Sequence, residues 1–301
     1  MLPDSPPPSS PSIRSRTADP NWRFREPSDT EFQQFATLIH DVAGISLNDS
    51  KRALVSRRLN ARLRDLGIDS LGDYTQLVQA DETGEEIVTL LDLIATNETH
   101  FFREKQHFDF LESRVFPGWI DEAHAGSRPR VIRAWSAACS TGQEPYSLAM
   151  QLLSFFPPDD GWKLEIEATD ISTSVLEVAR KAEWSAERAK EIPEHYLHQY
   201  MLRGTGPMIG KMRACRQLRE AVRFSRLNLN DDSYALPGNF DLIFCRNVLI
   251  YFSAERRAAV IERLTDRLTA DGLLFVGHAE SLHAHRARLK AMLPTVYSRA
   301  A

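Results

Sequence analysis

The spacing of apolar residues predicts an all-helical unit near the N-terminus. From Ser28 onward, apolar side chains recur every three or four positions, at Phe32, Phe35, Leu38, Ile39 and Val42. Ser28 and Glu31 have the spacing of a capping box at the start of this helix, and Gly44 is placed to end it. Further helices are predicted over residues 48–66, 70–80 and 82–95. We therefore expect residues 28–95 to form a small helical domain.

After about residue 128 the pattern changes to short apolar runs that alternate with amphipathic helices. Strands are predicted over residues 131–137, 164–169, 222–229, 240–246, 273–277 and 295–298. Helices are predicted over residues 144–156, 172–182 and 254–268. This alternation favours an α/β fold in which helices cover both faces of a doubly wound, mostly parallel sheet. We assign residues 128–301 to this second domain.

Two segments depart from this alternation. Residues 96–127 place dense polar side chains beside paired aromatics, and we interpret them as a linker that also forms a lid, although a plain linker fits the spacing equally well. Residues 186–221 contain a short helix and then two polar-apolar runs around a glycine-bearing loop at 204–210. This second segment predicts an inserted antiparallel β-subdomain.

Composition adds a tail and excludes several classes of protein. Residues 1–27 hold seven of the sixteen prolines, which predicts a disordered Pro/Ser-rich tail. The 37 Lys and Arg against 41 Asp and Glu give a net charge of −4, so a globally basic nucleic-acid binder is disfavoured. No apolar run approaches the ~18 residues that span a bilayer. We expect a monomer without membrane insertion.

The cysteine and histidine patterns bear on compartment and metals. Three cysteines without a CxxC pair exclude a disulfide framework and a cysteine zinc site, and they favour the reducing cytoplasm. The nine histidines form no HxxxH or HExxH pattern, so the sequence predicts no metal site.

Polar residues at the ends of the first two predicted strands are candidates for ligand binding. The turn after the first strand supplies one glycine, Gly142, where a dinucleotide fingerprint needs three, and Glu144 would repel a phosphate. An ordinary tight turn is the alternative. Asp170 ends the second strand, where an acid can accept hydrogen bonds from both ribose hydroxyls, or can cap the next helix. Together these features indicate a nucleoside ligand without phosphates, namely S-adenosylmethionine.

Further candidates follow the fourth predicted strand. Arg246 and Asn247 come directly after it, at the edge of the sheet where ligands bind, and Tyr251 lies a few residues on. A surface salt bridge is the alternative for Arg246, and an aromatic core residue with a wet hydroxyl is the alternative for Tyr251.

Five motifs in order resemble the CheR family of chemotaxis protein-glutamate methyltransferases. They are ATNETHFFRE, WSAACSTGQEPYSLAM, ATDIS, FDLIFCRNVLIYFS and GLLFVGHAES. The resemblance runs from about residue 28 to the C-terminus. It implies an N-terminal helical domain and a Rossmann-like S-adenosylmethionine methyltransferase domain with an inserted β-subdomain.

The resemblance also implies the reaction and the site. A methyl group would pass from S-adenosylmethionine to receptor glutamates, leaving S-adenosylhomocysteine and a methyl ester. The cofactor contacts carried over fall on Asn97, Thr99, Arg103, Glu144, Asp170, Asn228, Leu229, Arg246 and Asn247. Arg103 and Tyr251 are the candidates beside the transferring methyl group, and Arg103 could equally hold the carboxylate of the cofactor. The alternatives are a catalytically weak receptor-binding module and a methyltransferase of small molecules.

Two surfaces are candidates for docking the chemoreceptor. On the predicted helix 48–66, Lys51, Arg58 and Arg62 lie on one side beside the apolar stripe, either as a dock for an acidic receptor helix or as a solvated basic face. The loop with Gly204, Gly206 and Gly210 resembles the loop that tethers the receptor's C-terminal tail peptide in part of the family. A plain hairpin turn is the alternative for this loop.

Overall fold

The computed structural model describes residues 24–282, 285 and 287–300, which form two compact units. The first contains residues 24–38 and Leu47–Ile94, and the second contains Ile39–Ser46 and the chain from Ala95 onward. The predicted tail over residues 1–27 lies outside the described residues up to position 23. Within the described ranges no helix combines the length and the apolar character needed to cross a membrane.

The first unit is helical, as predicted. Its helices are α1 (Asp29–Ala43), whose residues from Ile39 on belong to the second unit, α2 (Arg52–Leu66), α3 (Leu71–Ala80) and α4 (Glu85–Ile94), with a 3₁₀ turn (Asp49–Lys51) before α2. The backbone N–H of Ser28 donates to the carboxylate of Glu31 at 2.8 Å, which confirms the capping box. The C-cap of α2 is Gly67, whose φ of +68° places it in the left-handed conformation that ends many helices.

Residues 96–127 contain more helix than the sequence analysis predicted. A continuous helical run comprises α5 (Gln106–Phe110), a π-helical turn (Leu111–Val115) and α6 (Phe116–His124). Its buried side chains include Phe108, Leu111 and Trp119. The prediction of a linker was wrong for this part because the π turn shifts the helical period. Pro117 lies in the first turn of α6, directly after the π turn.

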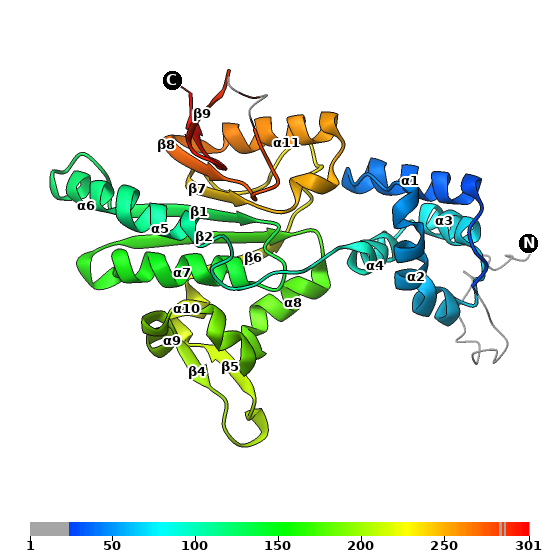
Figure 1. The fold of residues 1–301 in the computed structure, drawn as a ribbon, viewed down its shortest axis with the longest axis horizontal. Coiled ribbons are helices and arrows are strands. Elements are labelled where there is room, and N and C mark those ends of the chain that lie inside the picture. Colours follow the sequence, from blue (N-terminus) through cyan, green and yellow to red (C-terminus); the bar gives the residue numbers. More distant parts are fainter. Residues whose placement is uncertain (1–23, 283–284, 286, 301) are drawn as a thin grey trace, which may run out of the picture. The chain divides into compact units, whose positions relative to one another are not determined.

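The second unit contains a seven-stranded sheet in the order β6-β2-β1-β7-β8-β10-β9 (Figure 1). The bounds are β1 (Val131–Ala137), β2 (Lys163–Asp170), β6 (Val222–Arg226), β7 (Phe240–Cys245), β8 (Leu268–Phe275), β9 (Leu289–Leu293) and β10 (Val296–Arg299). The five strands from β6 to β8 are parallel, and β10 pairs antiparallel with both of its neighbours. The doubly wound, mostly parallel fold is confirmed.

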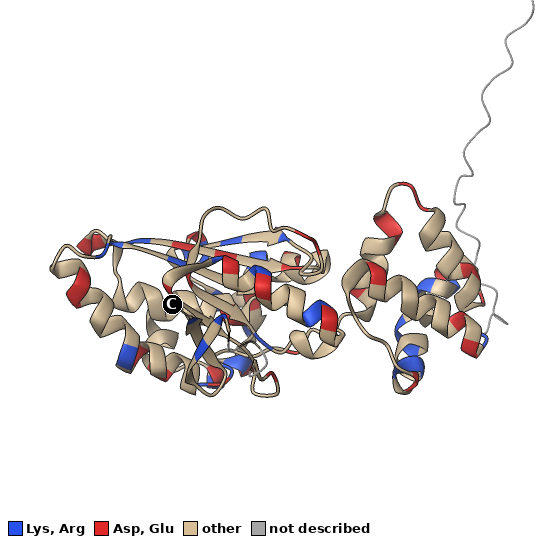
Figure 2. Cartoon of the chain, turned by 90° about the horizontal axis from the view of Figure 1, so that it is seen from above, with Lys and Arg blue, Asp and Glu red and all other residues tan. Residues whose placement is uncertain are grey.

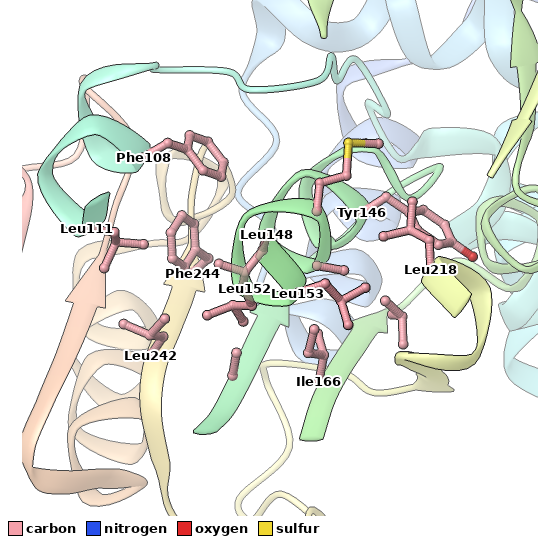
Figure 3. Close-up of a cluster of buried hydrophobic side chains, with 14 of the residues drawn as sticks. Phe108, Leu111, Tyr146, Leu148, Leu152, Leu153, Ile166, Leu218, Leu242 and Phe244 are labelled. Atoms are coloured by element: carbon pink, nitrogen blue, oxygen red, sulfur yellow. The ribbon is translucent and has the colours of Figure 1, made fainter. Parts of the chain in front are cut away.

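Helices cover both faces of this sheet. Figure 1 shows α7 (Gln143–Phe155) and α8 (Thr173–Lys181) on one side and α11 (Ala254–Asp266) on the other. Side chains alternate along β7, so that Leu242 and Phe244 join one buried cluster while Ile243 and Cys245 join another. Figure 3 shows the first cluster, in which side chains of α7 lie over the strands and Phe108 lies near Phe244.

The inserted segment forms a separate three-stranded antiparallel sheet in the order β3-β5-β4. Its strands are β3 (Glu183–Ser185), β4 (Met201–Arg203) and β5 (Lys211–Ala214), with α9 (Glu194–Tyr200) and α10 (Arg216–Glu220) on either side of the hairpin. The predicted pairing of β4 with β5 is confirmed. The third strand, β3, was not predicted.

Candidate cofactor site at the carboxyl edge of the sheet

The strand order creates one switch point at which a ligand can bind. The strands β2 and β6 lie on one side of β1, and the chain then returns to place β7 on its other side. At such a point the loops after adjacent strands run in opposite directions and leave a crevice at the carboxyl ends. The residues predicted from the ends of the first, second and fourth strands therefore meet at the same edge.

The turn after β1 is wound tightly and carries unusual backbone angles. Ala138, Ser140 and Gly142 have φ values of +68°, +50° and +95°. A Cβ on Gly142 would lie 3.0 Å from the Cβ of Ala179, so both the angle and the space require glycine. The N–H of Cys139 donates to the carbonyl of Thr169 at 2.8 Å, which ties this turn to β2.

Asp170 at the end of β2 also fixes that turn. Its carboxylate is buried and accepts the N–H of Ser140 at 2.8 Å and the N–H of Ser172 at 3.0 Å. The N-cap of α8 is Ser172, which accepts the N–H of Val175. Asp170 is therefore a link between the loops after β1 and β2 and not the cap of α8.

Glu144 lies in the first turn of α7 and is buried. Ser136 donates its hydroxyl to Oε1 at 2.6 Å, and Arg246 donates its Nε–H to Oε2 at 2.7 Å. Charge-assisted hydrogen bonds of this length are among the stronger ones in proteins. The acid is thus held at the edge of the sheet by β1 on one side and by the loop after β7 on the other.

Arg246 is the centre of the largest polar network at this edge. Only 1% of its side chain is exposed. Besides its bond to Glu144, Nη1 donates to the carbonyl of Arg103 at 2.6 Å and lies 3.2 Å from Nδ1 of His107. The rings of Phe108 and Phe244 lie 5.7 Å and 5.2 Å from its guanidinium carbon. The alternative of a surface salt bridge does not hold for this residue.

Glu104 and His107 complete the buried network, and neither was predicted. Burial opposes ionisation of Glu104, but the nearby Arg246 holds its pKa below the usual value. Burial and the same Arg246 lower the pKa of His107 to about 4, so its ring is neutral near pH 7. Oε2 of Glu104 is buried without a hydrogen bond and lies 3.5 Å from Nη1 of Arg246.

The same two residues and the exposed His278 bring three possible ligand atoms within 4.8 Å of one another. The spacing rule did not find this group because it looked for pairs of histidines close in sequence, and His278 is far along the chain from His107. The positively charged guanidinium of Arg246 already lies 3.5 Å from Oε2 of Glu104 and 3.2 Å from Nδ1 of His107, in the place that a metal ion would take. We therefore assign no metal ion to the group.

The turn after β7 is anchored by Glu280, which was not predicted either. Its buried carboxylate accepts the N–H groups of Gly277 at 2.6 Å, Asn247 at 2.8 Å and Ile250 at 3.2 Å. Burial raises its pKa, against the effect of these donors. Asn247 has a φ of +59°, and Gly277 leaves room for its amide group, since a Cβ there would lie 2.5 Å from Nδ2.

The loop after β6 holds Asn228 and Leu229. Asn228 donates to the carbonyl of Val42 at 2.7 Å and accepts the N–H of Asn230 at 3.0 Å. Leu229 is buried, and its carbonyl accepts the hydroxyl of Tyr234 at 2.9 Å. Asn228 is thus held by the segment Ile39–Ser46, which belongs to the same unit, and Leu229 is held by the side chain of Tyr234.

Asn97, Thr99 and Arg103 lie on the segment that precedes α5. The hydroxyl of Ser140 donates to the carbonyl of Asn97 at 3.0 Å, which joins this segment to the turn after β1. Arg188 donates to the carbonyl of Thr99 at 2.9 Å. Nη1 of Arg103 donates to the carbonyl of Glu98 at 3.2 Å, and the side chain is half-buried.

Tyr251 ends the short 3₁₀ turn (Leu249–Tyr251) after β7 and is half-buried. Its carbonyl accepts the N–H of Ser46 at 2.8 Å, and the next residue, Phe252, bridges Ile45. The structure thus joins Arg103, Glu144 and Arg246 in one network and links Asn97 to Asp170 through Ser140. Of the docking candidates, Lys51, Arg58 and Arg62 belong to the first unit, and the glycine loop belongs to the small sheet.

Comparisons with known proteins identify the family. The chain matches the CheR methyltransferase SAM-binding domain over residues 97–297 and the CheR methyltransferase all-alpha domain over residues 30–95. It is 40% identical to a chemotaxis protein methyltransferase of Escherichia coli K12, covering 90% of this chain and 91% of that protein. A chemotaxis protein methyltransferase of Salmonella typhimurium is 41% identical over 84% of both chains. Chemotaxis protein methyltransferase 2 of Pseudomonas aeruginosa is 38% identical, covering 89% of this chain and 92% of that one.

These matches cover both units and agree with the fold and with the cofactor inferred from the sequence. The acids at the carboxyl edge suit the donor groups of a nucleoside, and Glu144 beside a helix N-terminus disfavours a phosphate. The chain therefore belongs to the CheR methyltransferase family, and it is an S-adenosylmethionine-dependent methyltransferase.

Proposed function

We propose that the chain methylates glutamate side chains of bacterial chemoreceptors and forms glutamate methyl esters. The observation that carries this proposal is the combination of its relatives, which are chemotaxis protein methyltransferases, with the chemistry of the edge described above. That edge supplies buried carboxylates and a buried guanidinium. Such a set can position a reaction that needs no proton transfer.

The chemistry of the acceptor explains why no base is needed. A glutamate carboxylate has a pKa near 4.3 and is already ionised at neutral pH. When bound, S-adenosylmethionine supplies a methyl group made electrophilic by a sulfonium. An anion and a cation then give a neutral ester and a neutral thioether, so a dry site with aligned reactants favours the transfer.

The residues of this chain divide into binding and orienting roles in the proposal. Glu144 and Asp170 would bind the cofactor, with further contacts from Asn97, Thr99, Asn228, Leu229, Arg246 and Asn247. Arg103 would steer the substrate carboxylate, and Tyr251 would orient it. The carbonyl of Arg103 accepts a hydrogen bond from Arg246, and Ile250, the residue before Tyr251, donates its N–H to Glu280. These bonds would hold Arg103 and Tyr251 in place.

The basic side of α2 is proposed as a dock for an acidic receptor helix. Lys51 is exposed at the start of this helix, whereas Arg58 and Arg62 are half-buried. Arg58 donates to the carbonyl of Ile94, and Arg62 pairs with Glu86. Figure 2 shows Lys and Arg residues lying among Asp and Glu residues on the helical unit, so the attraction would be local. Lys51 therefore gives the cleanest test of docking, by substitution to Glu and by the salt dependence of KM for the receptor.

The loop between β4 and β5 is proposed to tether a receptor tail peptide. A Cβ on Gly204 would lie 1.9 Å from the carbonyl oxygen of Met208, and Gly206 and Gly210 have φ values of +56° and +84°. The glycines therefore set a loop shape that other residues would change. Arg203 and Lys211 flank it and could hold a terminal carboxylate, while the outer strand β4 offers main-chain groups. A tether would raise the local substrate concentration to about the millimolar range.

One experiment tests the reaction and its rivals. Methyl-labelled S-adenosylmethionine is incubated with the full chain and a receptor cytoplasmic fragment, and the label is then released with mild alkali. We expect transfer to the fragment as an alkali-labile ester, and no transfer to a fragment whose glutamates are replaced by alanine. Cofactor binding without transfer to the receptor would favour a receptor-binding module or a methyltransferase of small molecules. Label that survives alkali would exclude an ester.

A further inference from the structure

We infer that His107 is a positioning residue that holds Arg246, and that the guanidinium of Arg246 acts on the cofactor through Glu144 and the Arg103 backbone. The inference rests on the proposed cofactor site, because it explains how Glu144 and Arg103 come to their places there. It adds His107 and Thr295 to the residues on which cofactor binding depends.

The hydrogen bonds fix the tautomer of His107. The hydroxyl of Thr295 donates to the carbonyl of Pro294 at 2.5 Å, so its oxygen accepts the Nε2–H of His107 at 2.8 Å. Nδ1 therefore carries no proton, and its lone pair accepts Nη1–H of Arg246 at 3.2 Å. The hydrogen bonds are therefore all donated in one direction, from Arg246 to His107, from His107 to Thr295 and from Thr295 to the carbonyl of Pro294.

The position of Arg246 leaves its guanidinium little surface for a ligand. Its Nε–H is committed to Glu144 and its Nη1–H groups to Arg103 and His107. With 1% of the side chain exposed, the group is enclosed by its partners and by aromatic rings. Loss of the hydrogen bond that Arg246 donates to His107 would let the guanidinium rotate. Glu144 and the Arg103 carbonyl, which are bonded to the same guanidinium, would then move together.

The segment that Arg246 holds is not stable in this shape by itself. Phe102 and Glu104 have φ values of +50° and +57°, which cost side-chain-bearing residues energy. The N–H of Phe102 donates to the hydroxyl of Ser147 at 2.9 Å, and the carbonyl of Arg103 accepts from Arg246. Because Arg103 lies between two strained residues, its placement depends on that second bond.

The test is a double-mutant cycle read by calorimetry with S-adenosylhomocysteine on the full chain. His107→Phe keeps an aromatic ring beside Phe244 and Phe275 but removes both hydrogen bonds. We expect it to weaken binding about 10-fold, since the lost bond is charge-assisted. His107→Asn should rescue binding to within about 3-fold of wild type, because the amide oxygen can accept from Arg246 where Nδ1 did.

Coupling to Arg246 separates positioning from general structural damage. Arg246→Lys keeps the charge but cannot hold all three partners, so it should weaken binding by itself. The double variant His107→Phe with Arg246→Lys should then bind no more than about 3-fold more weakly than Arg246→Lys alone. Thr295→Val, which is isosteric, should show the same non-additivity and replaces His107→Phe if that variant does not fold. Tyr200→Phe is the control, since it removes a part-buried hydrogen bond to Ser154 in the same unit, and it should leave affinity within about twofold.

Several results would overturn the inference. Effects of His107→Phe and Arg246→Lys that multiply would show that the two residues act independently. An affinity of His107→Phe within twofold of wild type would show that His107 holds nothing the cofactor needs, and an equal loss in Tyr200→Phe would show a general structural effect. Wild-type protein that binds no S-adenosylhomocysteine would refute the proposed cofactor site itself, which is a distinct outcome.

Discussion

The substitution Arg62→Met tests whether the basic side of α2 is also a structural element of the helical unit. Arg62 donates from Nε to Glu86 at 2.9 Å and from Nη2 to the second oxygen of the same carboxylate. Tyr74 donates its hydroxyl to Glu86 at 2.8 Å. The side chain of Glu86 is 9% exposed and that of Arg62 is 33% exposed. Methionine keeps the length of the aliphatic stem and removes the charge.

The size of the effect follows from this geometry. Removing one partner of a fully buried ion pair costs about 3–5 kcal/mol, because it leaves a charge without compensation. One-third of Arg62 is in water, so solvent can reach the carboxylate in the variant and reduce this cost. Tyr74 also remains as a donor. We therefore expect a loss of about 2 kcal/mol in the free energy of opening the helical unit, which is roughly a 30-fold change in the opening equilibrium.

Hydrogen exchange on the full chain measures this loss. Amides of α2, α3 and α4 that exchange only by opening of the unit should exchange about 30-fold faster in Arg62→Met, while amides of β1 and β7 should not change. Arg57→Met is the control, since it removes an exposed arginine from the same helix. The double variant Arg62→Met with Glu86→Gln should recover most of the loss, because no unpaired charge remains and the amide oxygen still accepts the Tyr74 hydroxyl.

Two outcomes would refute this reasoning. Protection in Arg62→Met equal to that in Arg57→Met would show that the ion pair contributes nothing to stability. A double variant less stable than Arg62→Met would show that Glu86 does not become a liability when its partner is removed. Either way, receptor docking has to be tested separately at Lys51, whose substitution leaves this pair intact.

Four further predictions follow from other parts of the molecule. Asp170→Ala and Glu144→Ala should each weaken S-adenosylmethionine binding by calorimetry, by about 1.5–3 kcal/mol, with unchanged circular dichroism, and unchanged affinity in both would contradict the site. Deletion of residues 205–209 should abolish binding of a receptor tail peptide and preserve cofactor binding; a peptide that still binds the deletion variant as tightly as wild type would exclude the tether. The donors of Ser28 lower the pKa of Glu31 to about 2, so the stability advantage of wild type over Glu31→Gln in urea should be full above about pH 5 and shrink as the pH falls toward 2, whereas a pH-independent difference would refute it. Ala138→Gly should be more stable than Ala137→Gly by about 1–2 kcal/mol, because only Ala138 has a positive φ, and equal melting of the two variants would show no strain at Ala138.

Local patterns in the sequence predicted most of the fold. The capping box at Ser28, the parallel sheet and the β4–β5 hairpin each depend on residues close in sequence, and each is confirmed. The elements that were not predicted either pair with residues distant in the sequence or are mostly exposed to solvent. The strand β3 has three residues and pairs only with β5, and β9 at the sheet edge buries one residue of five, so neither shows an alternating pattern.

The candidate site also contains residues that the sequence could predict and residues that it could not. The rule that ligands bind at the carboxyl ends of strands was enough to select Glu144, Asp170 and Arg246, which the structure brings to one edge. Glu104, His107 and Glu280 could not be selected by spacing, since they act across loops that are far apart in the chain. A signal was nonetheless present for Glu104 and Glu280, because they lie in the quoted motifs ATNETHFFRE and GLLFVGHAES, where their chemistry was not assigned.

Backbone strain and buried charge occur together at this edge, and this has a consequence for every variant of the site. Of the seven described non-glycine residues with positive φ, all but Ala182 lie in the loops that carry the network or contact it. Three of these strained turns have a buried ionic partner: Asp170 holds Ser140, Glu280 holds Asn247, and Arg246 holds the carbonyl before Glu104. Strain of this kind persists only where the surroundings hold it. Side chains proposed to bind the cofactor therefore also shape the loops around it, so cofactor affinity and the order of these loops should change together on substitution.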